Sequence, residues 1–161
     1  MQSNPKRDEL HGLMVFLACL SHGLEATLGR GAKSVVYRAG VKVGAQTDPE
    51  EKSEDPVRAV ELVQRELIRK GIAWEVAPWK PASAEQYVYE KEGRLALKIV
   101  CRNCVIRCAL FRYGHEQQGS LCNLNQGEFC GIFQKITGKA ANLEIVHAGE
   151  NACLKELTWS K

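Results

Sequence analysis

The spacing of apolar residues changes partway along this chain, and the change limits which folds are open to it. Up to Gly71 apolar residues recur at helical spacing, as on the buried stripe of an α-helix. From Ile72 to Cys101 they alternate with polar residues, which is typical of strands with one buried face. A further helical segment and two alternating segments follow. This order predicts an α+β fold: N-terminal helices, an antiparallel sheet covered by helices, then a C-terminal helix and β-hairpin.

Residues that start and stop helices place these elements along the chain. Asp55 suits an N-cap, Pro56 the first helical position and Gly71 the C-terminal end of one helix. We expect this helix to bury Val60, Val63, Leu67 and Ile68. Other helices are expected over about 8–29, 32–44 and 121–137, although β-branched residues keep a strand open as the alternative for 32–44. Strands are expected over 72–76, 86–90, 95–100, 142–147 and 153–159, with a polar loop over 47–54 and a hairpin turn at 91–94.

Length and charge favour one small domain of ordinary surface character. The 161 residues, 45% of them hydrophobic, suffice for a single core, so we expect one domain over 1–161. The net charge of +3 is small and dispersed, which argues against a nucleic-acid partner. The apolar run 13–20 follows Lys6 and Arg7 like a weak export signal, but helical spacing continues beyond it. We find no run long enough to cross a bilayer and expect a cytoplasmic protein without a membrane partner.

Cysteine is the most distinctive residue type in the chain. There are seven, and an odd number cannot pair completely in a disulfide framework, so a reducing compartment is expected. Five of them are spaced so that a fold could gather them: Cys101, Cys104, Cys108, Cys122 and Cys153. Thiolates are the ligands that zinc and iron–sulfur clusters prefer. We therefore predict Cys104, Cys108, Cys122 and Cys153 as ligands of zinc or, alternatively, of an iron–sulfur cluster.

Burial is the competing interpretation, because free cysteine is often a small interior hydrophobe. We assign Cys19 and Cys130 to this role, since both lie among apolar residues of expected helices. His147 lies near Cys153 and could complete a mixed coordination shell. The sequence contains no nucleophile elbow, phosphate-binding loop or dinucleotide fingerprint, so no catalytic residue is assigned and a stand-alone enzyme is not expected.

Glycines recur at helical spacing in two of the expected helices. Gly40 and Gly44 are four residues apart, as are Gly127 and Gly131, and such pairs let another backbone approach closely. Gly149 suits a turn that needs positive φ. In its order and distances the set resembles the 4-vinyl-reductase-type, hydrocarbon-binding small-molecule domain. The matching segments are 28–32, 36–40, Gly44, 122–131, 138–139 and 149–153.

This resemblance implies a fold related to trafficking-complex subunits and to haem- and nitric-oxide-sensing domains, usually dimeric and with an apolar ligand pocket. In the phenol-sensing members a zinc ion is held by cysteines, and Cys122 and Cys153 match two of those positions. Ile145 stands where the sensors have another cysteine. A zinc site would therefore have to recruit Cys104, Cys108, Glu144 or His147.

Three functions follow from these observations. The first is a ligand-binding sensor or accessory protein that takes up a small apolar or aromatic molecule and acts as a homodimer. Its pocket is expected to include Trp74, Trp79, Tyr87 and Phe111, for which ordinary core packing is the alternative. The second is a metal or iron–sulfur redox protein that uses the clustered cysteines. The third is an enzyme accessory factor.

Overall fold

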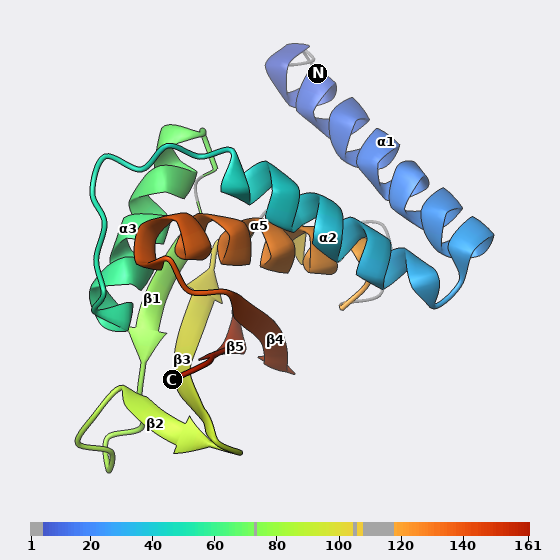
Figure 1. Cartoon of the computed structure of the whole chain (residues 1–161). Helices are drawn as coiled ribbons and strands as arrows, with labels where there is room; N and C mark the ends of the chain where they lie inside the picture. The colour runs from blue at the N-terminus through green and yellow to red at the C-terminus, as the bar shows by residue number, and fades with distance from the viewer. Residues whose placement is uncertain (1–4, 73, 105, 108–117) are drawn as a thin grey trace.

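The computed structural model describes residues 5–72, 74–104, 106–107 and 118–161 and shows helices packed on one sheet (Figure 1). Its elements are, in chain order, α1 (Pro5–Leu28), α2 (Gly31–Ala45), α3 (Pro56–Arg69), β1 (Glu75–Trp79), β2 (Val88–Lys91), β3 (Arg94–Arg102), α5 (Ser120–Thr137), β4 (Ala141–Ala148) and β5 (Ala152–Trp159). This order confirms the α+β class. The position of α2 settles the alternative at 32–44 in favour of a helix.

The sheet is antiparallel, with strand order β1-β3-β5-β4, and β2 pairs with the same strand, β3, as β1 does. The hairpin expected at 91–94 is present, with Lys91 opposite Arg94. Glu92 and Gly93 both have positive φ there, as a tight two-residue hairpin turn requires. The first strand begins at Glu75 rather than Ile72 and continues through Pro78. Pro78 is tolerated because β1 is an edge strand, paired only with β3.

The core lies between one face of the sheet and the helices α3 and α5. It contains, among others, Leu97, Ile99, Phe129, Phe133, Leu143, Leu157 and Trp159, with Val60, Val63 and Leu67 from α3. Asp55 caps α3 through a 3.0 Å hydrogen bond from the Val57 backbone N–H to its Oδ1. The expected burial of Ile68 is wrong, because its side chain is 57% exposed, and Leu62 and Ala59 complete the buried face instead.

Helices α2 and α5 pack backbone to backbone at their glycine pairs. A Cβ atom built at Gly40 or Gly44 would lie 2.2 Å from a carbonyl oxygen of α5. One at Gly127 or Gly131 would lie 2.0 or 2.3 Å from a carbonyl oxygen of α2. Any side chain at these positions would clash with the opposite helix, as the sequence spacing predicts. Gly149 is different: its φ is not among the positive ones, so that expectation is wrong.

Helix α1 packs along one edge of the helical layer and leaves most of its surface exposed (Figure 1). Ala18 and Ser21 are buried, but Cys19 is exposed, so its predicted burial is wrong, whereas that of Cys130 is confirmed. The expectation that no run is long enough to cross a bilayer is wrong, because the stretch Glu9–Leu28 within α1 is long and apolar enough by length and composition. One such helix near the start of a chain is weak evidence for a span, since signal sequences and core helices pass the same test.

Candidate functional site: a thiol-lined pocket

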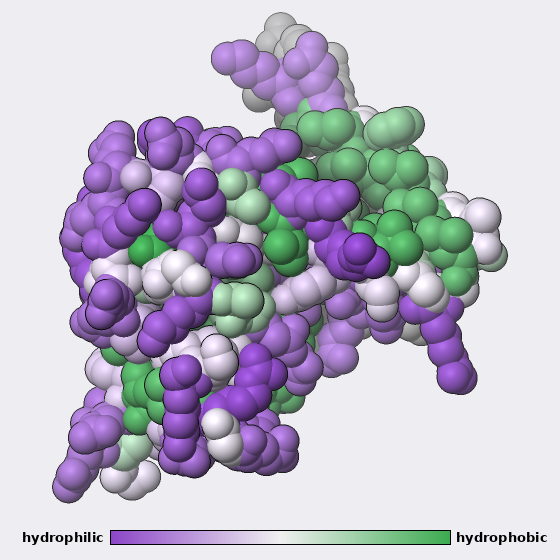
Figure 2. Space-filling view, viewed as in Figure 1, coloured by the Kyte–Doolittle hydropathy of each residue, from purple (hydrophilic) through white to green (hydrophobic). Residues whose placement is uncertain are grey.

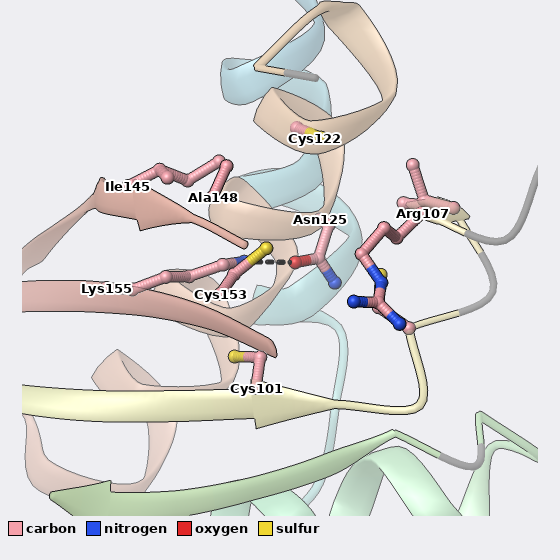
Figure 3. Close-up of a pocket in the computed structure, with 10 residues that line it drawn as sticks. Cys101, Arg107, Cys122, Asn125, Ile145, Ala148, Cys153 and Lys155 are labelled. Atoms are coloured by element: carbon pink, nitrogen blue, oxygen red, sulfur yellow. Dashed lines mark hydrogen bonds between the residues drawn. The ribbon is translucent and has the colours of Figure 1, made fainter. Parts of the chain in front are cut away.

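A small pocket lies where the ends of β3, β4 and β5 meet the first turns of α5 (Figure 3). Its position follows from strand register, because Cys101 and Cys153 are directly opposite each other on β3 and β5. Side chains alternate along a strand, so both lie on the face that carries the core. The lining consists of Cys101, Cys104, Ile106, Arg107, Cys122, Asn125, Ile145, Ala148, Cys153 and Lys155.

Three of the four predicted metal ligands, Cys104, Cys122 and Cys153, line this one pocket, and Cys101 joins them. Cys108 lies outside the described residues. Burial raises the pKa of the Cys101, Cys122 and Cys153 thiols above the ordinary cysteine value, although Lys155 acts in the opposite direction on each. These three groups are therefore neutral thiols at neutral pH rather than thiolates.

A buried cation also faces the pocket. Lys155 is 5% exposed, and its Nζ donates a 2.8 Å hydrogen bond to Oδ1 of Asn125, which is 7% exposed. Arg107 approaches Asn125 from the opposite side (Figure 3), and its Nη1 donates to the Gly149 carbonyl oxygen at 3.2 Å. None of the described residues that line the pocket is Asp or Glu. The polar wall is therefore electropositive.

The rest of the lining is apolar, and the pocket is tight. Ile106, Ile145 and Ala148 contribute hydrocarbon surface. The cavity volume is about 20 Å³, which is room for little more than one water. A larger ligand therefore enters only when one wall of the pocket moves.

Of the predicted aromatic ligand residues, the three that the structure describes do not line this pocket. Trp74, which directly precedes β1, is buried in the core. Trp79 and Tyr87 line a separate open cleft together with Tyr89, and the volume of this cleft is about 250 Å³. There the Lys98 ammonium lies 5.9 Å from the centres of the Trp79 and Tyr89 rings. Phe111 lies outside the described residues, so its role as a ligand contact stays a prediction.

Sequence reasoning missed the polar wall, although the sequence contained a signal for it. Along β5, Lys155 has the same parity as Cys153 and Leu157, so strand alternation places it on the inner face. Asn125 follows Cys122 by three residues on α5 and so lies on the same side of that helix. Only the tertiary structure shows that Arg107 and Ala148 line the pocket, since no spacing in the sequence connects them to the cysteines.

The described residues do not form a ready metal centre. Among them, no group of three histidine, cysteine or acidic side chains is placed to share an ion. Lys155 and Arg107 place positive charge beside the thiols, which opposes a cation. Ile145 lines the pocket at the position where the resemblance in sequence expected a further ligand. As they stand, the described residues alone do not form a zinc or iron–sulfur site, and the metal site, which includes Cys108 outside the described residues, stays a prediction.

Comparison with known proteins identifies a solved structure with a similar fold. No protein-family model matches the chain, and no curated protein matches it. Among solved structures it is similar to the crystal structure of the phenol-responsive sensory domain of the transcription activator PoxR with phenol. The TM-score is 0.61 at 15% sequence identity, covering 91% of this chain and 74% of the sensory domain. The likeness is one of fold alone: this chain shares the fold of that domain.

Proposed function

We propose that this chain is a small-molecule-binding domain of a sensor or accessory protein and that the thiol-lined pocket is its ligand site. The observation that carries the proposal is a small, partly enclosed pocket, with converging polar groups on one wall and apolar groups on the other, in a fold shared with a sensory domain. Enclosed apolar sites with a few oriented polar groups are typical of ligand pockets. Membership of the 4-vinyl-reductase-type family is part of the same proposal.

Native mass spectrometry of the freshly purified chain tests the ligand site. We expect a co-purified or added small molecule to bind, and Ala148→Leu to abolish binding because the larger side chain fills the pocket. Ala84→Leu is the matched control, since Ala84 lines the separate cleft with Trp79 and Tyr87. Loss of binding in Ala84→Leu with retention in Ala148→Leu would move the ligand to the aromatic cleft and contradict the assignment.

We also propose that α1 packs against a second copy of the chain. Figure 2 shows apolar surface gathered over the region of α1, and exposed patches of this kind mark interaction sites. The Ser120 backbone N–H of α5 donates a 2.6 Å hydrogen bond to Glu25, which fixes the end of α1 to the domain. A helix held at the protein surface in this way suits a protein partner better than a bilayer. Its exposed large apolar residues are Leu10, Leu13, Val15, Phe16, Leu17, Leu20 and Leu28.

Sedimentation equilibrium tests this interface. The chain is expected to be a dimer, and Phe16→Glu to be a monomer, because Phe16 is 64% exposed on α1. Ile68→Glu is the control: it places the same charge on a similarly exposed apolar position of α3, 57% exposed, and should leave the dimer intact. A monomeric wild-type chain would contradict the proposal, as would partition of the chain into lipid vesicles.

A metal or iron–sulfur protein is the second candidate, favoured by the convergence of Cys101, Cys104, Cys122 and Cys153 on one pocket. It requires the thiols to move closer together than they lie here. Elemental analysis and an absorption spectrum of anaerobically purified protein decide between the candidates. Stoichiometric zinc, or iron with sulfide and a brown colour, favours this second function; a metal-free protein that binds small molecules favours the first.

A further inference from the structure

Lys155 is unusual among the buried charges of this chain. The described part of the chain buries three charged side chains, Glu66, Lys155 and Glu156. Glu66 has an ion pair with Arg69, and Glu156 has one with Lys91. Lys155 has only the neutral amide of Asn125 as its hydrogen-bond partner among the described residues. A buried ammonium with three donors and no anion is costly, so this group is arranged for a negative charge that the described lining does not supply.

Arg107 is a second cationic donor and also lies beside Asn125. Arg107 reaches toward Asn125 from the side opposite Lys155 (Figure 3), and one of its nitrogens is used by the Gly149 carbonyl. A guanidinium has five N–H donors in a planar fork that matches a carboxylate. Lys155 and Arg107 therefore lie on either side of Asn125, and a carboxylate head group beside that amide would receive charge-assisted hydrogen bonds from both.

The remaining walls of the pocket limit which group can be attached to the anionic head group. Ile106, Ile145 and Ala148 offer hydrocarbon contacts, and the neutral thiols beside them are also weakly polar. The narrow free space excludes a bulky body unless the pocket opens widely. A metal cation is disfavoured by the same two positive groups that favour an anion.

We propose that the thiol-lined pocket binds a short-chain organic carboxylate, with the head group between Lys155 and Arg107 and the alkyl part against Ile145 and Ala148. This inference rests on the proposed small-molecule function and names its ligand class. It accounts in one arrangement for the buried ammonium, the lack of an acid among the described lining residues and the apolar wall.

The test is a titration of the ¹⁵N-labelled full chain with propionate and with its neutral counterpart propionamide, followed by NMR. Propionate is expected to shift the Asn125 side-chain amide and the Cys153 backbone amide. Its dissociation constant should be at least about tenfold lower than that of propionamide, the effect of a charged hydrogen bond. Lys155→Met is expected to weaken propionate binding by about tenfold or more, and Lys139→Met, the same change at an exposed lysine, to leave it unchanged.

Arg107→Gln is the second variant and keeps the test decisive if Lys155→Met fails to fold. It should weaken propionate binding while leaving any binding of propionamide intact. Equal binding of propionate and propionamide would overturn the carboxylate inference and leave the small-molecule function standing. Binding of neither compound, in a protein that also takes up no other small molecule by native mass spectrometry, would overturn both.

Discussion

Substitution of Gly127 by alanine should destabilise the protein through the contact between α2 and α5. A Cβ atom at this position would lie 2.0 Å from the carbonyl oxygen of Tyr37 and 2.9 Å from the backbone nitrogen of Val41. Non-bonded heavy atoms prefer separations of about 3.5 Å, so the helices would have to part by more than about 1 Å. Both obstructing atoms belong to the backbone, and no side-chain rotation can relieve the clash.

The magnitude follows from two opposing effects. Overpacking of this kind costs about 1–3 kcal/mol, and a rigid backbone obstacle places Gly127→Ala near the upper end. Alanine is a better helix former than glycine by about 1 kcal/mol, which offsets part of the cost. We therefore expect the free energy of unfolding to fall by about 2 kcal/mol.

Urea denaturation followed by circular dichroism measures this change. Gly12→Ala is the matched control, because a Cβ at Gly12 of α1 has no atom within 4 Å and should cause no loss of stability. The reasoning would be refuted if Gly127→Ala were as stable as the wild type, since the two helices would then not be in backbone contact.

Three further outcomes are expected. Alkylation of the native protein, read by mass spectrometry, should modify the exposed Cys19 first and Cys130 last, because burial raises the pKa of Cys130 to about 11; rapid labelling of Cys130 would contradict its burial. The hydrogen bond from the Ser120 backbone holds the pKa of Glu25 below its ordinary value, so its stabilisation is present above that value and is lost as pH falls through the lowered one. The protection factors of α1 amides, which are corrected for the slower intrinsic exchange in acid, should therefore fall in acid, and Glu25→Gln should remove that dependence. Asp55→Ala should lower the free energy of unfolding by about 1 kcal/mol through loss of the α3 N-cap, and an unchanged urea midpoint would argue against the cap.

Local signals in the sequence were sufficient for most of the fold. Asp55, Pro56 and Gly71 delimit α3 because capping depends on neighbouring residues only. The glycine pairs indicated a close helix contact because only glycine tolerates such an approach. The prediction that Ile68 is buried failed because the apolar stripe of a helix can be wider than the surface that packs against it. The periodicity of the apolar residues does not show where that contact ends.

The site depended more on tertiary structure. Clustered cysteines pointed to the region of the thiol-lined pocket, and the register of β3 and β5 then determined that Cys101 and Cys153 meet. The aromatic residues were assigned by type alone, and the fold separates Trp74 in the core from Trp79 at an open cleft. Lys155 was passed over because a lysine is rarely buried, although strand alternation placed it inward.

Chemical-shift mapping with a set of small organic acids and their neutral amides tests the central claim most directly, namely that the thiol-lined pocket receives a small molecule. The structure predicts that bound compounds shift the amides of 122–125 and 153–155 and that Ala148→Leu removes these shifts. Shifts confined to Trp79 and Tyr87, or no shifts with any compound, would contradict it.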